Sequence, residues 1–347
     1  MNMCLKYFFS AIKPPVFILI TVLLYLPSGL YAENNKAILI GISQYADPDL
    51  NDLAYADEDV KTFEVVLKNF SEEKNFNITL LLNDRAKKAD ILKVIMDAVK
   101  ESQKKPLDNF LLVYAGHGIP GNIQSNKTNS FLAPHDSVLN EFFREGNSGM
   151  INNETFINKA WLVKQLSSIN AKSVIMILDS CYSGTKDFGA LYAENYGFKL
   201  AFTDNQGNKR GVAIVQKGSG MDFGDKKIAF IASSKEGQQS AEYKDLKHGA
   251  LSYAIFEYLN IIRKETEANE IKDITIDGIF TNVNKLFETI QVGGVSLAAV
   301  HQPVLFTIPE DSGVKNMKFM SVRGIKKPRI KTGIVEIITD PDAAEIY

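Results

Sequence analysis

Cysteine is scarce in this chain, with only Cys4 and Cys181 among 347 residues. Cys4 precedes the apolar N-terminal stretch, so it does not occupy the position at the end of that stretch where a lipid-attachment cysteine would lie. If the N-terminal segment is removed, Cys181 is the only thiol and an internal disulfide framework is excluded. A single cysteine accompanied by histidines elsewhere is instead a candidate for nucleophilic catalysis.

An excess of charge of either sign is also lacking. Lys and Arg total 39 against 41 Asp and Glu, and no run of Lys or Arg forms a basic stripe, so a nucleic-acid partner is not expected. No group of residues has the spacing of a zinc site, and no loop has the run of carboxylates that calcium requires. We therefore expect no metal and no cofactor. We also rank His135, His248 and His301 below His117 as catalytic candidates.

The N-terminus has the three zones of a secretory signal. Lys6 and Lys13 precede an uncharged stretch over 14–30, and small and polar residues follow. The stretch is a little shorter than the roughly 18 residues that a spanning helix needs. We expect residues 1–32 to be a signal peptide, with a retained membrane anchor as the alternative. A secreted or periplasmic location follows from that expectation.

Short apolar runs alternate with segments of helical periodicity, which is typical of βαβ units and a mainly parallel sheet. Six strands are predicted, over residues 36–42, 78–82, 109–114, 173–178, 227–232 and 303–308. Helices are predicted around 60–70 and 92–99 and over 155–166, 249–262 and 276–290. The expected fold class is therefore α/β, with a six-stranded sheet flanked by helices.

Three segments interrupt this alternation. Residues 119–153 and 185–225 are rich in Gly, Asn, Ser and Asp, and we expect long loops that are either functional or variable surface insertions. Residues 310–331 are basic and are predicted to be a linker. Residues 332–347 alternate apolar and polar side chains as a strand does, which indicates the start of a second, truncated domain.

The candidate catalytic residues follow two of the predicted strands. His117 lies between glycines just after the strand at 109–114, and Cys181 lies just after the strand at 173–178. Carboxyl ends of neighbouring parallel strands meet at one edge of a sheet, where ligands bind. There, an imidazole can activate a thiol, and the N–H groups of Gly118 and Cys181 are candidates for an oxyanion hole. A buried spectator cysteine and a histidine in a turn are the alternative interpretation.

Two motifs carry a resemblance to a known family. Residues 114–118 (YAGHG) and 179–184 (DSCYSG) resemble the catalytic motifs of the caspase-like cysteine peptidases, on the metacaspase and bacterial caspase-homologue side. His117 precedes Cys181 by 64 residues, close to the ~50 of caspases. Tyr182 stands where metacaspases usually carry histidine. The resemblance implies a three-layer caspase-like sandwich, a peptidase domain over 33–309, Cys181 as nucleophile, His117 as base, and protein or peptide substrates.

The resemblance also assigns a specificity pocket. It places Asp179 and Asp59 in the pocket for the residue before the scissile bond, where two carboxylates favour Arg or Lys over Asp. The alternative is structural: Asp57 and Asp59 favour the N-terminal end of their helix, and Asp179 caps the loop around Cys181. Asp57 replaces Asp59 in the pocket if the helix begins in another register.

Residues 333–347 resemble the opening of a PEGA domain, a small β module of surface-associated bacterial proteins, although Ala343 replaces the usual glycine. Three functional hypotheses remain at this stage. The first is an active endopeptidase that cleaves after Arg or Lys. The second is a catalytically silent caspase-like scaffold or binding module, and the third is a legumain- or gingipain-like cysteine peptidase of other specificity.

Overall fold

The computed structural model describes residues 33–72, 76–120, 130–138, 154–180, 200–203, 209–213, 227–234, 240–308 and 312–325. The predicted signal peptide, the PEGA-like segment and Cys181 lie outside the described residues. The described helices and strands all belong to the unit Asn34–Tyr347. Within this part of the chain, no helix is both long and apolar enough to span a membrane.

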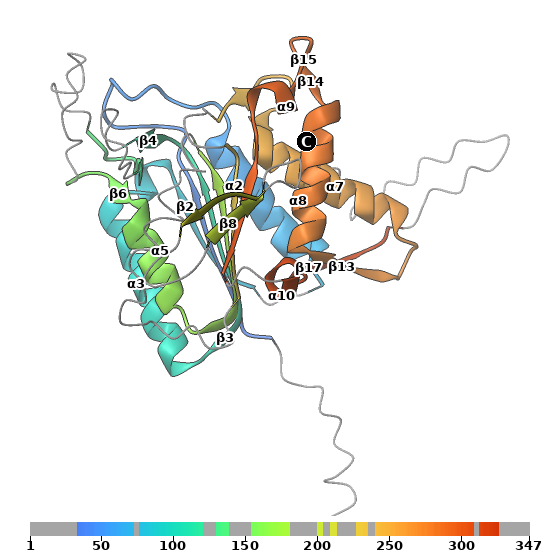
Figure 1. Ribbon diagram of the computed structural model, residues 1–347. Coiled ribbons are helices and arrows are strands. Elements are labelled where there is room, and N and C mark those ends of the chain that lie inside the picture. Colours follow the sequence, from blue (N-terminus) through green and yellow to red (C-terminus); the bar gives the residue numbers. More distant parts are fainter. Residues whose placement is uncertain are drawn as a thin grey trace, which may run out of the picture. The chain divides into compact units, whose positions relative to one another are not determined.

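A six-stranded sheet forms the centre of this unit (Figure 1). Its strands, in chain order, are β1 (Asn35–Gly41), β2 (Phe76–Leu82), β3 (Leu107–Ala115), β7 (Ala171–Asp179), β10 (Lys227–Ala232) and β16 (Val304–Ile308). Their spatial order is β16-β10-β7-β3-β1-β2, and every neighbouring pair is parallel except β10 and β16. The predicted mainly parallel six-stranded sheet is confirmed.

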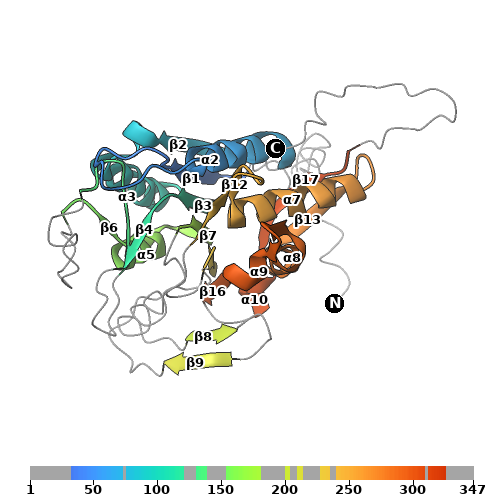
Figure 2. The same ribbon diagram turned by 90° about the horizontal axis from the view of Figure 1, so that it is seen from above.

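Helices cover both faces of the sheet (Figures 1 and 2). One face packs against α3 (Lys88–Lys104) and α5 (Lys159–Ser168). The other packs against α2 (Ala56–Val65), its π-helical extension Val66–Phe70, α7 (Ala250–Glu265) and α8 (Ile276–Thr289). Because both faces are covered, the inner strands are apolar along almost their whole length.

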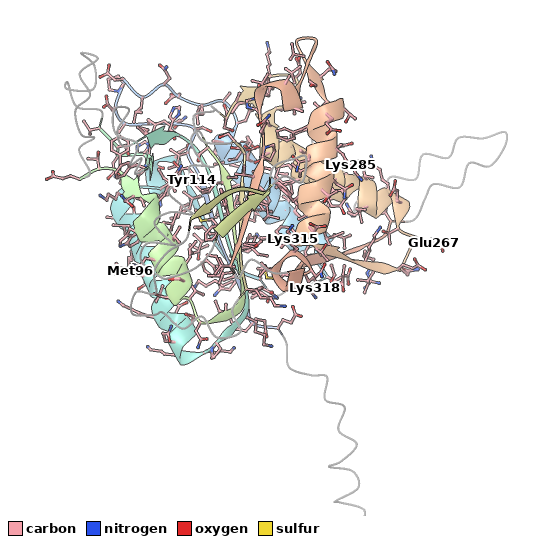
Figure 3. The ribbon with its side chains drawn as sticks, in the orientation of Figure 1. Met96, Tyr114, Glu267, Lys285, Lys315 and Lys318 are labelled. Carbon is pink, nitrogen blue, oxygen red and sulfur yellow. The ribbon has the colours of Figure 1, made fainter. Side chains whose placement is uncertain are left out.

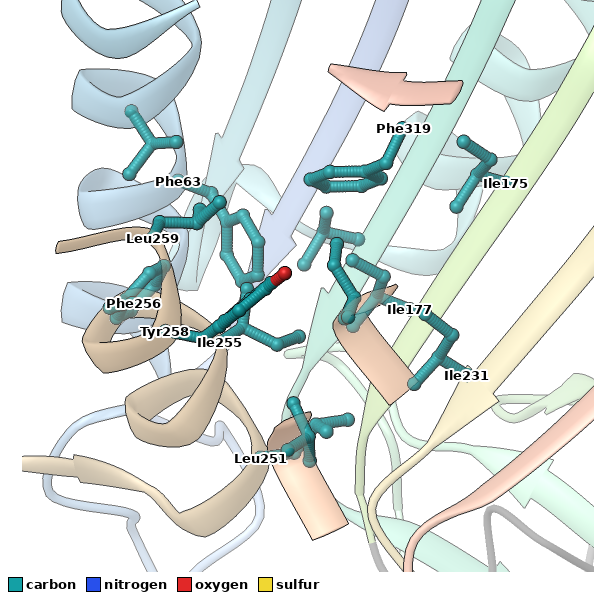
Figure 4. Close-up of a cluster of buried hydrophobic side chains, with 14 of the residues drawn as sticks. Phe63, Ile175, Ile177, Ile231, Leu251, Ile255, Phe256, Tyr258, Leu259 and Phe319 are labelled. Atoms are coloured by element: carbon teal, nitrogen blue, oxygen red, sulfur yellow. The ribbon is translucent and has the colours of Figure 1, made fainter. Parts of the chain in front are cut away.

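Alternating side chains of the strands supply two separate cores. Ile38 and Ile40 of β1 point to the α3 and α5 side, whereas Leu39 points to the α2 and α7 side. Figure 4 shows the second core, where the Phe63 and Phe256 rings meet edge to face at 4.7 Å. On the outside of this layer the side chains are charged, as Lys285 and Glu267 show in Figure 3.

The remaining elements are short. They are η2 (Asn83–Arg85), β4 (Gly118–Pro120), β5 (Ser130–Leu132), β6 (Ile157–Asn158), β8 (Leu200–Thr203), β9 (Lys209–Ala213), β11 (Glu242–Tyr243), β12 (His248–Gly249), β13 (Ile271–Thr275), β14 (Gln291–Val292), β15 (Val295–Ser296), α9 (Leu297–Val300), α10 (Ser312–Lys315) and β17 (Lys318–Arg323).

Two predicted loops contain regular structure. Within 119–153, β5 pairs with β4 on one side and with β6 on the other. Since β6 takes up Ile157–Asn158, the helix predicted over 155–166 begins only at Lys159. Within 185–225, β8 and β9 form an antiparallel pair. Short strands of three to five residues carry too little periodicity to be recognised in a polar sequence.

The predicted linker over 310–331 is wrong for its described part. Ser312–Lys315 forms α10, and β17 pairs antiparallel with β13. Val314, Phe319, Met320 and Val322 are buried in the core shared with α7 and α8. Lysines alternate with these residues in the sequence, and their charge favoured the prediction of a solvent-exposed linker. The apolar side chains between them complete the core. The folded domain therefore continues at least to residue 325.

Candidate active site

A cavity of about 410 Å³ opens at the carboxyl ends of the central strands. This is the edge where open α/β sheets bind ligands. Four residues selected from the sequence line it: Asp59, His117, Gly118 and Asp179. Ser180 also lines it, and Cys181 is the next residue in the chain. Four of the five predicted site residues are thus brought together, and the fifth lies outside the described residues.

The register of the sheet places the two motifs level with each other. β3 and β7 are neighbours, and Ala115 is the Cα partner of Asp179. His117 follows Ala115 by two residues, and Cys181 follows Asp179 by two residues. The backbone N–H of Gly116 still donates to the carbonyl of Asp179, at 3.3 Å, so the strands remain joined at this point.

The segment around His117 is tightly packed. A side chain at Gly116 would place its Cβ 2.8 Å from the hydroxyl of Tyr114 and 3.0 Å from that of Tyr45, so only glycine fits. The backbone N–H of His117 donates to the Tyr45 hydroxyl at 2.7 Å, and the two rings lie 4.8 Å apart. The Tyr114 hydroxyl is within 3.0 Å of the backbone carbonyl oxygens of His117 and Ala133, to which it donates. These contacts hold the imidazole in one orientation.

The tautomer of His117 follows from its hydrogen bond. Its Nε2 atom lies 2.7 Å from the backbone carbonyl oxygen of Asn51. A carbonyl can only accept, so Nε2 carries the hydrogen and, in the neutral ring, Nδ1 is the basic nitrogen. Burial lowers the pKa of His117, opposed by the Asn51 carbonyl and Asp52. A neutral imidazole with Nδ1 unprotonated is the form that a general base requires.

Asp179 is anchored to the first turn of α7. Its Oδ2 atom accepts from both the backbone N–H and the hydroxyl of Ser252, each at 2.9 Å, and its Oδ1 accepts from the hydroxyl of Ser240 at 2.8 Å. A carboxylate here is stabilised by the N-terminal end of the helix. Asp179 therefore caps the N-terminal end of α7, whereas the loop around Cys181, which it was predicted to cap, lies outside the described residues.

Asp59 belongs to α2 and is 1% exposed. Its Oδ1 atom lies 2.7 Å from Nδ1 of His248, and its Oδ2 accepts from the backbone N–H of Gly249 at 3.1 Å. Burial raises the pKa of Asp59 to about 7; His248 opposes this shift and the negative charge of Asp179 adds to it. Asp57, the alternative from the sequence, instead contacts Ser43 and Lys61 and is not a lining residue of the cavity.

Gly249 brings the two carboxylates together. A Cβ on this residue would lie 2.4 Å from Oδ2 of Asp179 and 3.0 Å from Oδ2 of Asp59. Both oxygens therefore lie against the backbone of the same residue, at the start of α7. Any larger residue would push them apart, so glycine at 249 is a condition of the pairing.

Glu242 is a third carboxylate of the cavity, and the sequence analysis missed it. It accepts from the backbone N–H groups of Ala54 at 2.6 Å and Tyr55 at 2.9 Å, and thereby caps the N-terminal end of α2. Burial raises its pKa, and the charge of Asp179 adds to this effect. We call Asp59, Asp179 and Glu242 together the acidic pocket. The contact between His248 and Asp59 was also missed, because no local signal links residues that are 189 positions apart.

The acidic pocket has no fixed cation among its described lining residues, which include neither Lys nor Arg. The groups that the acidic pocket offers to a ligand are carboxylate oxygens, each of which can accept two hydrogen bonds. No group of His, Cys, Asp and Glu within the described part of the chain is arranged to hold a metal ion. The arrangement suits an organic cation held next to a histidine base.

Comparison with known proteins adds a family and a fold. The family model of the caspase domain matches residues 34–307. A crystal structure of a Geobacter sulfurreducens protein is similar with a TM-score of 0.51 and 16% identity, covering 83% of this chain and 99% of that one. Caspase-1 from Spodoptera frugiperda is similar with a TM-score of 0.46 and 17% identity, covering 80% and 85%. No curated protein sequence matched the chain.

Proposed function

The chain belongs to the caspase-domain family, whose members are generally cysteine peptidases, and on that premise we propose that it is an endopeptidase using Cys181 and His117. The observation that carries this proposal is the hydrogen bond from Nε2 of His117 to the Asn51 carbonyl. It leaves Nδ1 as the base on a ring that follows the end of β3, where Ala115 is level with Asp179, two residues before Cys181 in the sequence.

The proposed reaction has two halves. Nδ1 of His117 takes the proton from the Cys181 thiol, and the sulfur attacks the carbonyl carbon of the scissile peptide bond. The N–H groups of Gly118 and Cys181 donate to the oxyanion that forms. His117 then delivers its proton to the leaving amine and the C–N bond breaks, leaving a thioester. A water molecule, deprotonated by His117, hydrolyses the thioester and regenerates the thiol.

We propose that the enzyme cleaves after Arg or Lys. The described lining of the cavity holds three carboxylates and neither Lys nor Arg, so a guanidinium meets opposite charge whereas an aspartate meets like charge. Asp179 and Asp59 both accept hydrogen bonds from the start of α7, through Ser252 and Gly249, yet each carboxylate has further lone pairs that can accept. A planar guanidinium can therefore bridge the two acids.

Labelling and substrate profiling test this proposal. A peptidyl electrophile ending in arginine should modify Cys181, as read by mass spectrometry of the digested protein, and the Cys181→Ala variant should remain unlabelled. A catalytically silent scaffold would leave Cys181 unmodified. A panel of fluorogenic peptides that differ only in the residue before the scissile bond should rank Arg and Lys above Asp and Asn. A preference for another residue would favour a legumain- or gingipain-like specificity.

We also propose that the protein acts outside the cytoplasm, after removal of residues 1–32. The charged, apolar and small-residue zones of the N-terminus support this location. N-terminal sequencing of protein recovered from a secreting host should begin at Glu33. Recovery of an intact N-terminus in the membrane fraction would instead identify residues 1–32 as an anchor.

A further inference from the structure

The inference that follows rests on the proposed function and deepens it. We infer that His248 is the positioning residue that sets the charge of the acidic pocket. It holds the carboxyl group of Asp59 and shares one proton with it, and a cationic substrate side chain expels that proton on binding. Selectivity for Arg over an uncharged side chain of the same shape then rises with pH.

The pair is isolated from solvent. His248 is 4% exposed and Asp59 is 1% exposed, and Nδ1 and Oδ1 are 2.7 Å apart. The ring of Phe256, from α7, meets the imidazole edge to face at 5.2 Å, and Tyr253 lies on a second side at 6.4 Å. Bulk water therefore does not stabilise either charge, and each group depends on the other.

Neither member of the pair holds the proton firmly. An ionised Asp59 without His248 is costly, because burial raises the pKa of this carboxyl to about 7. Nε2 of His248 is buried and has no hydrogen-bond partner among the described residues, so a second hydrogen on this ring would have no acceptor there. Two arrangements of one shared proton therefore compete: the ion pair, and the neutral acid with a neutral ring.

The surroundings decide when the proton leaves. Asp179 lines the same cavity as Asp59, and its negative charge favours the protonated state of Asp59; Glu242 is a further carboxylate of this lining. His117 lines the same cavity. On the strand beside His248, Tyr243 is its cross-strand partner and contacts His301.

The remaining charges near the pair are on α2. Asp57 and Glu58 both pair with the single Lys61, so a net charge of about −1 remains on the outer side of the helix. No Lys or Arg among the described residues contacts Asp59. A guanidinium entering the pocket supplies a fixed cation that no described Lys or Arg supplies to Asp59, and it favours the ionised carboxylate. Binding of the cation and loss of the proton are coupled, and the coupling is reciprocal.

A matched pair of substrates isolates this coupling. Two fluorogenic peptides carry either arginine or citrulline, its uncharged isostere, before the scissile bond. Ionisation of Cys181 and His117 affects both peptides alike, so the ratio of their kcat/KM values reports the acidic pocket alone. In the wild type we expect this ratio to rise with pH through the region near 7, by severalfold and at most about tenfold per pH unit.

Two variants separate a proton-sharing role from a merely structural one. In His248→Asn, the side-chain amide can donate to Oδ1 of Asp59 from the place of Nδ1 but cannot take up the proton, so the midpoint of the ratio should move to lower pH. In His248→Phe, an aromatic ring still fills the space but the hydrogen-bond donor to Asp59 is lost. The pH midpoint of the Arg/citrulline ratio should therefore move to higher pH. Thermal melting confirms that each variant is folded. A ratio that does not change with pH, or midpoints that stay in place in both variants, would overturn the inference.

A binding measurement keeps this test independent of catalysis. Agmatine, which carries the guanidinium and chain of arginine, is titrated into Cys181→Ala by calorimetry in buffers of different ionisation enthalpy. Near pH 6.5, we expect agmatine binding to Cys181→Ala to release protons into the buffer. The double variant Cys181→Ala/His248→Asn should release fewer protons. Binding without proton release overturns the inference alone. Equal peptide cleavage by wild type and Cys181→Ala overturns the proposed function instead.

Discussion

Ser252 gives both of its donors, the backbone N–H and the hydroxyl, to the same oxygen of Asp179, each at 2.9 Å. The last residue of β7 thereby fixes the first turn of α7. The same contact holds Asp179 in the cavity, with its second oxygen toward Ser240. One carboxylate thus joins the strand that leads to Cys181 to the helix that completes the acidic pocket.

Charge and shape at Asp179 can be separated by substitution. Asp179→Asn keeps an oxygen that can accept from Ser252 but removes the charge, so it should fold and lose the preference for Arg over citrulline by about tenfold or more. Asp179→Ala should also lower the melting temperature, because buried donors of α7 lose their acceptor. Asp57→Asn, outside the cavity, is the control and should retain the preference. An Asp179→Asn enzyme with wild-type selectivity would contradict the pocket assignment.

Loss of either proposed catalytic side chain should remove peptidase activity. Cys181→Ala removes the nucleophile without adding bulk, and His117→Ala removes the base; each should lower kcat/KM by about 10³-fold or more while the circular dichroism spectrum stays unchanged. His135→Ala is the control, because His135 contacts a backbone carbonyl of Gln44 and does not line the cavity. Near-wild-type turnover by the Cys181 or His117 variant would refute the assignment.

The pH profile should reflect the buried state of His117. Burial lowers its pKa, so the ring stays neutral and competent as a base below the ordinary histidine pKa of about 6.5. With the citrulline peptide, the acid limb of kcat/KM should therefore fall below pH 6.5. The unfolded chain, with the ordinary histidine pKa of about 6.5, takes up this proton before the folded protein does. The free energy of unfolding should therefore decrease as pH falls from 6.5 through the lowered pKa of folded His117. An acid limb at or above pH 6.5 would contradict the described environment.

Gly249→Ala should damage the acidic pocket selectively. The new Cβ would lie 2.4 Å from Oδ2 of Asp179, so the carboxylates must separate, and kcat/KM for the Arg peptide should drop by at least tenfold. Gly278→Ala is a matched control near another helix start, where the closest atom is 3.1 Å away and no cavity residue is involved. It should leave the Arg preference unchanged. Equal selectivity in both variants would mean that Gly249 does not control the pairing.

Self-processing is expected at Lys209 and Arg210 or at the basic pair 226–227. Lys209 and Arg210 belong to β9 and pair with Thr203 and Phe202 of β8, so this hairpin must open before the chain can enter the active site. We expect slow fragmentation of wild-type protein on a gel, absent from Cys181→Ala and altered in Lys209→Gln/Arg210→Gln. Identical fragments from wild type and Cys181→Ala would exclude self-processing.

Local patterns in the sequence predicted most of the architecture. The six apolar runs became the six strands of the sheet, because a strand buried on both faces must be apolar along its length. His117, Gly118, Asp59 and Asp179 were selected because of their places in strand-end and helix-start motifs, and they line one cavity. The basic segment after residue 310 was misjudged, since the four core residues of α10 and β17 are interspersed with lysines.

The amino-acid sequence by itself determined which apolar runs form strands, the two motifs that follow two of them and the thiol within one motif, because burial and strand-end position leave local signatures. Only the tertiary structure decided which acids share the pocket and what supports them. Glu242 meets Ala54 from 188 residues away, and His248 meets Asp59 from 189 residues away. Such partners leave no periodicity in the chain. The raised pKa values of Asp59 and Glu242 arise from desolvation and from the nearby charge of Asp179, which act only once α2, β12 and α7 have packed together.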